Sequence, residues 1–380
     1  MKKILISMLG LAFIFSILPT KGVSAQDPLP PEPNSGAVVC SPNVYLTQPD
    51  NCLPLGPSAY LTDLAKLGLT IPPRPLPASK PDPSLTQLPY SYFHLQEGQY
   101  VPIYSAPGDT GAGVQQFPPG FVYISYTDRV DQNGIYYRTQ SGGWIPGKGA
   151  RVGEISNFQG LQFYATPRNS FGWAFEQIPV KSAPGYNTPN TSKQIYPFQV
   201  VQIYDTKNVD NADWNMIGPD EWVEARKVAQ VVINTTPPQG VTNGRWIDVN
   251  LAEQSLAVYD KNQLVFATVI ASGMEPFWTR PGLFQIREKK ASETMRNNDP
   301  SAFYYLEDVP WTMYFDAARA LHGAYWRTRF GYAQSHGCVN LSVGDAHWLF
   351  NWAVEGDWVY VHDPSGQTPT DPSLYSNDAY

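Results

Sequence analysis

Cys338 follows two histidines in the sequence, and this set of residues could carry out nucleophilic catalysis. His336 lies just before it in "SHGCVN", and His322 lies in the earlier stretch "LHGAYW". The thiolate is the reactive form of cysteine, and a histidine within hydrogen-bond reach can remove the thiol proton. The pattern therefore predicts a nucleophilic thiol. A plain buried thiol and a zinc site that includes His347 are the alternatives, although the spacing matches no familiar set of zinc ligands.

The two histidines are not equivalent candidates for the base. If the segment is extended, His336 and Cys338 point to the same face, which does not in itself position them for proton transfer. His322 belongs to another segment and can approach the thiol from across the site. Gly337 lets the backbone turn closely at the nucleophile, so that neighbouring N–H groups can face a tetrahedral oxyanion. Both histidines are candidates for the base, and His322 is the one that can reach the thiol from another segment.

A mostly β domain must position these residues. The stretches "WIDVNL", "SLAVYD" and "LVFATVIAS" alternate or are continuously apolar, which predicts strands. The stretch "VGDAHWLFNWAVEG" predicts one helix, because its apolar residues share a face and Gly356 ends it. We place this domain at residues 244–362, after a linker at 234–243 and before a flexible tail at 363–380.

This last domain resembles the catalytic domain of the L,D-transpeptidase family, of YkuD type. The resemblance runs in order through "IDVNLAEQSLAVYD", "ASGMEPFWTRPGLFQI", "VPWTMYF", "LHGAYW" and "SHGCVNLSVGDAHWLFNW". It implies a β-sandwich-like fold with few helices. It also implies that Cys338 is the nucleophile, that His322 is the general base, and that the carbonyl of Gly323 orients the imidazole.

The remaining candidate site residues surround this pair. The backbone of Gly337 and the side chain of His336 are expected at the oxyanion or the substrate. The expected substrate-binding residues are Ser335 and Asn340, which match motif positions of the family, together with Trp326 and Tyr314. The variable stretch "EKKASETMRNNDPSAFYYLEDVPW" is expected to form a lid over the cleft.

The resemblance implies a peptidoglycan L,D-transpeptidase that acts in cell wall biogenesis and cell shape. Cys338 would form a thioester with a stem peptide, and an amine of a second stem would resolve it. No metal or organic cofactor is expected. Resolution by water, as in an L,D-carboxypeptidase, or by a protein amine, as in protein anchoring, are the alternatives. A wall-binding protein without catalysis is a third.

An internal repeat precedes this domain. "VPIYSAPG" at 101–108 returns as "IPVKSAPG" at 178–185, an offset of 77 (178 minus 101), and Trp144 and Trp222 are offset by 78 (222 minus 144). Short alternating strands with Gly and Asn turns predict small barrels, and they resemble bacterial SH3-like domains. We place the two repeats at 91–153 and 154–233. They either bind the wall polymer or brace the enzyme, with Tyr136, Tyr137 and Trp173 as candidate wall contacts.

The N-terminal region predicts export. Residues 1–25 read as a signal peptide, with two lysines, an apolar stretch and "VSA" at the end. Residues 26–90 are a Pro-rich spacer in which Cys40 and Cys52 are expected to form a disulfide, which leaves Cys338 as the free thiol. The net charge of −7 without a basic stripe argues against nucleic acid. We expect an extracytoplasmic, cell-wall-associated protein with no membrane span after cleavage.

Overall fold

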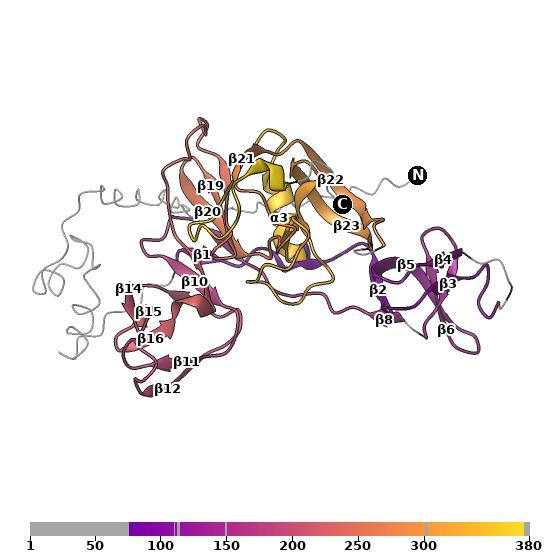
Figure 1. Ribbon diagram of the computed structural model, residues 1–380, viewed down its shortest axis with the longest axis horizontal. Coiled ribbons are helices and arrows are strands. Elements are labelled where there is room, and N and C mark those ends of the chain that lie inside the picture. Colours follow the sequence, from indigo (N-terminus) through magenta and orange to yellow (C-terminus); the bar gives the residue numbers. More distant parts are fainter. Residues whose placement is uncertain (1–75, 110, 112–114, 149, 301–302, 376–380) are drawn as a thin grey trace, which may run out of the picture. The chain divides into compact units, whose positions relative to one another are not determined.

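Figure 1 shows a computed structural model of the chain, which describes residues 76–109, 111, 115–148, 150–300 and 303–375. The chain divides into two units, Met1–Gly56 and Pro57–Tyr380, and all described residues belong to the second unit. The predicted signal peptide, the Cys40–Cys52 disulfide and most of the Pro-rich spacer lie outside the described residues. No helix of the described residues has the length and apolar character needed to cross a membrane.

The described chain is mainly β, as the sequence predicts. Its first part holds a two-residue strand and a short 3-10 helix, followed by the strands of the first repeat. These elements are β1 (Ala78–Ser79), η1 (Pro83–Thr86), β2 (Ser91–Leu95), β3 (Val101–Ile103), β4 (Gln115–Phe117), β5 (Phe121–Asp131), β6 (Ile135–Thr139), β7 (Trp144–Pro146) and β8 (Ala150–Val152).

The second repeat follows. Its first strand, β9, pairs with a strand of the last domain and so belongs to the sheet of that domain. The elements are β9 (Leu161–Phe163), β10 (Phe171–Ala174), β11 (Ile178–Lys181), β12 (Asn190–Ile195), β13 (Val200–Gln202), β14 (Asp205–Val209), β15 (Ala212–Gly218), β16 (Glu221–Glu224), η2 (Ala225–Lys227) and β17 (Val228–Val231).

The sequence repeat is also a repeat of strand pairing. In the first copy Tyr104 lies opposite Trp144, and in the second copy Lys181 lies opposite Trp222. The partners differ by the offsets seen in the sequence, 77 (181 minus 104) and 78 (222 minus 144). The pairs β3–β4 and β6–β7 of the first copy likewise return as β11–β12 and β15–β16. The two copies therefore share one strand arrangement.

Two of the candidate wall contacts lie inside these repeats. Tyr137 is 6% exposed and packs with the core of the first repeat, and Trp173 is 1% exposed. Both side chains occupy inward positions of their strands, so the prediction that they contact the wall is wrong. Tyr136 is half-buried on the other face of its strand.

The last domain contains the longest strand, β23, and the only α-helix of the described residues. Its elements are β18 (Trp246–Asn250), β19 (Ser255–Asp260), β20 (Gln263–Val269), β21 (Gly282–Gln285), β22 (Glu288–Asn297), β23 (Tyr304–Asp316), β24 (Arg319–Gly323), β25 (Val339–Leu341), α3 (Val343–Trp352), β26 (Trp358–His362) and η3 (Pro372–Leu374). The predicted lid is the hairpin of β22 and β23, drawn in orange in Figure 1.

Two sheets and α3 enclose the core of this domain. One sheet has the order β1-β9-β20-β19-β18-β26-β21, and the other contains β25-β24-β23-β5-β2-β8 with β22 paired to β23. Apolar side chains from both sheets and from α3, among them Val249, Leu321, Leu341 and Leu349, form one buried cluster. Burial of such side chains is the main favourable contribution to folding. The strands that carry the candidate site, β24 and β25, are thereby fixed against the helix.

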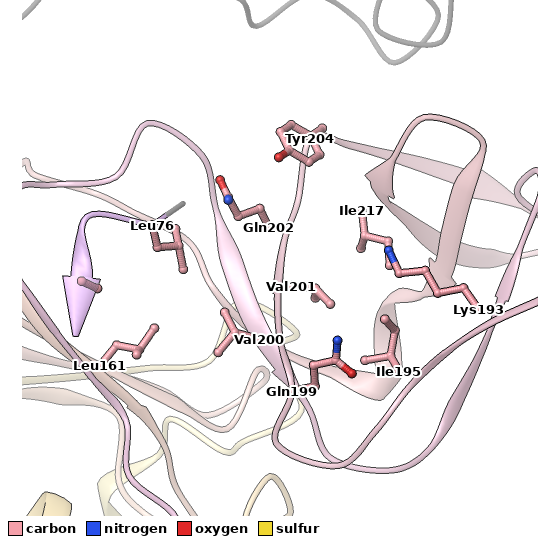
Figure 2. A pocket seen from close by; sticks show the side chains of 11 residues that line it. Leu76, Leu161, Lys193, Ile195, Gln199, Val200, Val201, Gln202, Tyr204 and Ile217 are labelled. Atoms are coloured by element: carbon pink, nitrogen blue, oxygen red, sulfur yellow. The ribbon is translucent and has the colours of Figure 1, made fainter. Parts of the chain in front are cut away.

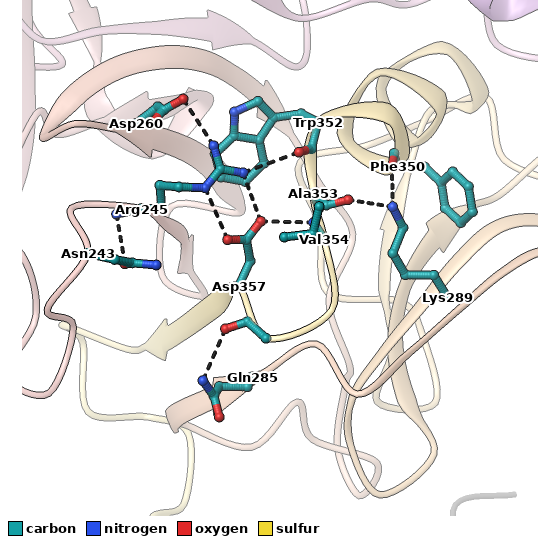
Figure 3. Close-up of polar contacts among 11 residues, drawn as sticks. Asn243, Arg245, Asp260, Gln285, Lys289, Phe350, Trp352, Ala353, Val354 and Asp357 are labelled. Atoms are coloured by element: carbon teal, nitrogen blue, oxygen red, sulfur yellow. Dashed lines mark hydrogen bonds and ion pairs between the residues drawn. The ribbon is translucent and has the colours of Figure 1, made fainter.

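The helix begins and ends with polar contacts. Ser342 caps its first turn, because the Ser342 hydroxyl accepts a hydrogen bond from the N–H of Asp345 over 3.2 Å. At the other end Arg245 donates to the carbonyl of Trp352 over 3.2 Å and pairs with Asp357 and Asp260 (Figure 3). The guanidinium also lies 4.0 Å from the centre of the Trp352 ring. This single side chain joins the start of β18 to the end of α3 and the start of β26.

The first repeat is joined directly to the last domain. Strand β5 pairs in parallel with β23, so that Phe121 lies opposite Tyr304 and Tyr123 lies opposite Leu306. Next to this pairing, the N–H of Ser125 donates to Glu307 over 2.9 Å. A single nine-stranded sheet therefore crosses from the predicted repeat at 91–153 into the predicted domain at 244–362.

The tail at 363–380 was predicted to be flexible, but the described part to residue 375 is held in place. Thr368 and Tyr375 are buried, and the backbone N–H of Thr368 donates to Asp363 over 2.7 Å. The Tyr375 ring lies 5.1 Å from the Arg319 guanidinium. Sequence polarity alone gave the wrong expectation here, because one aromatic residue is enough to anchor a short segment.

The second repeat carries a hollow of about 360 Å³, which Figure 2 shows. Apolar side chains such as Val200, Val201 and Ile217 form much of its lining, with Lys193 and Gln202 at its edge. None of its lining residues is a histidine, cysteine or carboxylate. Lys193 and Tyr204 are its titratable lining residues, and the predicted thiol and histidines all lie outside it, so the candidate site lies elsewhere.

Candidate active site

Cys338 lies in a cavity of about 540 Å³. The cavity also contains both histidines of the sequence motif and a set of aromatic and apolar side chains. The lining residues are Phe121, Met274, Met295, Phe303, Tyr304, Leu306, Ala318, His322, Trp326, Arg327, Gln334, Ser335, His336, Cys338 and Asn340. A large and mainly apolar cavity with a few convergent polar groups is the usual form of an active site.

The Cys338 thiol is partly buried and is held as a neutral group. Its sulfur lies 3.7 Å from the carbonyl of Ala318, to which the S–H can donate. Burial raises the pKa of Cys338 to about 11, although the N–H of Ala320 and the charge of Arg319 oppose this shift. At neutral pH the thiol is therefore protonated, and a base is needed to form the thiolate.

His322 is buried and fixed at both ring nitrogens. Its Nδ1 lies 3.2 Å from the carbonyl oxygen of Gly323, and its Nε2 lies 3.0 Å from Nδ2 of Asn340. A carbonyl oxygen can only accept, so Nδ1 carries the proton and Nε2 is the acceptor. Burial lowers the pKa of His322 to about 4, and the charge of Arg327 adds to this shift. The imidazole is therefore neutral, with its basic nitrogen covered by the Asn340 amide.

Arg327 determines which way the Asn340 amide points. The guanidinium Nε donates to Oδ1 of Asn340 over 2.6 Å. The amide oxygen therefore faces Arg327, and the amide N–H groups face His322. The same guanidinium donates to the side-chain and backbone oxygens of Gln334, over 3.0 and 2.7 Å. A chain of hydrogen bonds thus runs from Arg327 through Asn340 and His322 to Gly323, and it selects one imidazole tautomer.

The turn before the thiol depends on Gly337 and Ser335. Gly337 has φ of 112°, a conformation that residues with a Cβ rarely adopt. Its N–H donates to the Ser335 hydroxyl over 3.1 Å, and this hydroxyl donates to the Cys338 carbonyl over 2.5 Å. The carbonyl of Gly337 accepts from Thr279 over 2.8 Å. The turn is therefore closed by its own hydrogen bonds.

These contacts do not fit the roles that we expected for Ser335 and for the N–H of Gly337. Ser335 was expected to bind substrate, but it is 4% exposed and its hydroxyl closes the turn. The N–H of Gly337 was expected to face an oxyanion, but it donates to Ser335. Among the described residues the backbone N–H groups of His336 and Cys338 have no backbone acceptor, so they are the remaining candidates at this turn.

His336 lies at the exposed side of the cavity. Its ring centre is 4.6 Å from that of Phe277 and 5.4 Å from that of Tyr304. Partial burial lowers its pKa, and the charge of Arg327 contributes to the shift. A neutral, accessible imidazole at the cavity mouth can contact a substrate, whereas none of the described hydrogen bonds joins it to Cys338.

The other expected substrate residues are divided between the cavity and its surroundings. Trp326 lines the cavity, with its ring centre 5.6 Å from that of His322. Tyr314 lies on β23 opposite Ala320 and is not a lining residue. Burial is the main cause that raises the pKa of Tyr314, followed by the charge of Glu293. From the predicted lid, Tyr304 reaches the cavity.

The sequence did not point to Arg327 or Phe121 as site residues. Arg327 stands directly after Trp326, and its position beside the motif histidine was the available signal. Phe121 comes from the first repeat, and only the pairing of β5 with β23 brings it to the cavity. Within the described ranges, no three His, Cys, Asp or Glu side chains are grouped as metal ligands would be.

Comparison with known proteins identifies the domain that holds this cavity. Residues 244–361 match the family model of the YkuD L,D-transpeptidase catalytic domain. The chain contains an L,D-transpeptidase catalytic domain. All candidate catalytic residues fall inside the matched range, whereas Phe121 lies outside it. The two small repeats precede this domain and are not covered by the family match.

Three relatives show how far the similarity extends. The putative L,D-transpeptidase YciB of Bacillus subtilis (strain 168) is 21% identical over 159 residues, which are 33% of this chain and 73% of that protein. An L,D-transpeptidase (Yku) structure from Stackebrandtia nassauensis is 27% identical, with a TM-score of 0.28, over 35% of this chain and 60% of that chain. The chain thus covers less than two thirds of the Stackebrandtia protein.

A solved catalytic domain is matched over its whole length. The catalytic domain of the E. faecium L,D-transpeptidase is 25% identical, with a TM-score of 0.30, over 32% of this chain and 100% of that chain. The family match at residues 244–361 covers the L,D-transpeptidase domain.

Proposed function

We propose that this protein is an exported, cell-wall-associated peptidoglycan L,D-transpeptidase that works through a thioester on Cys338. The observation that carries the proposal is the pairing, in one cavity, of a free thiol with a buried imidazole held by the Gly323 carbonyl. The thiol and the imidazole lie inside the range that matches the L,D-transpeptidase catalytic domain. The substrate would be a stem peptide of peptidoglycan and the product a cross-link between two stems.

The first half-reaction makes the thioester. When substrate displaces the Asn340 amide, Nε2 of His322 can accept the Cys338 thiol proton. The sulfur attacks the carbonyl carbon of the amide between the third residue and the D-residue at position four. The N–H groups of His336 and Cys338 then face the oxyanion. The C–N bond breaks, and the leaving amine takes the proton from His322, which restores the neutral imidazole.

The second half-reaction resolves the thioester. The amine of a second stem attacks the thioester carbonyl, and His322 accepts one proton from this amine. The C–S bond breaks and the thiolate takes the proton back from the imidazolium. The proton count closes without a redox step, and no cofactor takes part in the proposed scheme. Tyr304 and Trp326 form the apolar walls against which the peptide would lie.

The decisive experiment is incubation of the mature protein with tetrapeptide muropeptides, followed by mass spectrometry of the products. The expected product is a dimer that has lost one D-alanine. Release of D-alanine without a dimer would instead show hydrolysis, as in an L,D-carboxypeptidase. A thioester that only an added protein amine resolves would show protein anchoring. The proposed activity is wrong if the wild-type protein leaves the muropeptides unchanged. It is also wrong if the Cys338→Ala variant forms the same products as the wild type.

A further inference from the structure

Arg327 is a charged side chain in the cavity that the proposed mechanism does not use as a binding group. Its guanidinium lines the same cavity as Cys338 and is partly buried. Its hydrogen-bond partners, Asn340 and Gln334, are uncharged. None of the described carboxylates pairs with it, whereas Arg280 and Arg319 both pair with Asp316.

The electrostatics of the cavity show an uncompensated cation. Burial lowers the pKa of Arg327 to about 10, so the group is still charged at neutral pH. Arg327, His322 and His336 line the same cavity, and the charge of Arg327 lowers the pKa of both histidines. A buried charge without a partner is unfavourable, and an anion that enters the cavity would relieve this cost.

We propose that Arg327 binds a carboxylate of the substrate peptide. Of the five N–H donors of a guanidinium, three are used by Asn340 and Gln334, which leaves two for a ligand. Carboxylates match the planar arrangement of these donors. The anion site itself does not depend on the proposed function, but its identification with a peptide does. The carboxylate is either the terminal one of the D-residue or a side-chain carboxylate of the third residue.

The first test compares two small reagents that alkylate Cys338. Iodoacetate carries a carboxylate where iodoacetamide carries a neutral amide of nearly the same size. Rates with both are measured by intact-mass spectrometry for wild type and Arg327→Gln. A cation near the thiol should raise the rate with iodoacetate selectively. We expect Arg327→Gln to lower the iodoacetate-to-iodoacetamide rate ratio about 10-fold, as an ion pair of moderate strength implies.

Two further variants separate charge from positioning. Arg327→Lys keeps the charge but cannot hold Asn340 and Gln334 together, so both rates should fall while their ratio stays close to that of wild type. Arg329→Gln removes an exposed arginine outside the cavity and should change neither rate. An unchanged ratio in Arg327→Gln, or an equal change in Arg329→Gln, would overturn the anion site.

The second test names the carboxylate. Stem peptides are compared in which either the terminal carboxylate or the third-residue carboxylate is converted to an amide. For wild type, kcat/KM should fall about 10-fold or more for one of the two amides, and Arg327→Gln should lose this preference. If both amidated peptides react as fast as the unmodified peptide, Arg327 does not recognise a peptide carboxylate. This holds even if the iodoacetate-to-iodoacetamide rate ratio supports an anion site. If the wild-type protein processes none of these peptides, the proposed function is wrong, and the test says nothing against the anion site.

Discussion

The side-chain amide of Asn340 donates a hydrogen bond to Nε2 of His322 over 3.0 Å. This nitrogen is the one that would accept the thiol proton. In the resting site the base is therefore fixed in the right tautomer but covered, and the thiol instead donates to the Ala318 carbonyl over 3.7 Å. Substrate must replace the amide before proton transfer, which would couple activation of the thiol to substrate binding.

Removing the amide should slow acyl-enzyme formation. Asn340→Ala leaves the Arg327 guanidinium without its acceptor and removes one of the two contacts that hold the His322 ring. A wrongly oriented or wrong-tautomer imidazole is a poor base, so we expect acylation of Cys338 by a carbapenem to fall about 10- to 100-fold. The rate is followed by intact-mass spectrometry. Asn351→Ala, an exposed asparagine of α3, is the matched control. Equal rates in Asn340→Ala and wild type would contradict the positioning role.

The pH dependence of alkylation should show that the Cys338 thiol ionises only at high pH. Burial disfavours the thiolate and raises the pKa of Cys338 to about 11, while His322 at about 4 is too weakly basic to stay protonated as its counter-ion. The rate with iodoacetamide should therefore still increase above pH 9. After unfolding in urea, the midpoint should return to about 8.5. A plateau that is already reached near pH 7 would indicate a preformed thiolate–imidazolium pair.

Loss of Arg245 should destabilise the catalytic domain. Arg245→Ala leaves Asp357 buried, at 3% side-chain exposure, without its cation (Figure 3). Breaking a buried ion pair at one side typically costs about 3–5 kcal/mol in the free energy of unfolding. Urea denaturation measures the change. Arg245→Ala with Asp357→Asn should recover part of the loss, and Lys193→Ala, at an exposed pair of the second repeat, should cost under about 1 kcal/mol. A loss as small as that of Lys193→Ala would contradict the role of Arg245.

The first repeat should be needed for activity on soluble substrates. Phe121 forms part of the cavity wall, and β5 holds residues Tyr304–Leu306 of β23 in place. We expect fragment 234–380 to lose most activity on soluble muropeptides. In the full chain Phe121→Ala should raise KM several-fold, and Tyr196→Ala, an exposed aromatic of the second repeat, should not. A fragment as active as the full chain would show that the repeats act in some other way, such as wall binding, which sedimentation with sacculi measures.

The sequence is most informative about this cavity where the motif is local. Cys338 and His322 were singled out by residue type, and the structure places both in one cavity. The two tryptophans of the sequence repeat, Trp144 and Trp222, lie at equivalent positions of their strand pairs. The roles of Ser335 and Gly337 were not predictable in the same way, because their hydrogen bonds depend on the backbone path of one tight turn. Arg327 could be read from sequence as a charge, but its lack of an acidic partner is a property of the folded cavity.

Long-range pairing explains the rest of the difference. The alternating pattern of β5 identifies it as a strand but contains no information about its second neighbour. The pairing of Phe121 with Tyr304 joins positions separated by 183 residues (304 minus 121). No local signal specifies such a contact. The sequence therefore suggests separate domains at 91–153 and 244–362, whereas in the structure one sheet contains strands from both segments.

That pairing also sets an order of assembly. Residues Phe121–Tyr123 lack one of their strand neighbours until residues Tyr304–Leu306 have been synthesised. The first repeat thus presents an open strand edge for most of the life of the nascent chain, and such edges are sites of wrong association. Parallel pairing of distant segments forms slowly. The completion of the cavity wall and the protection of this edge therefore depend on the same pairing, and we expect a chain that ends before Tyr304 to be prone to aggregate.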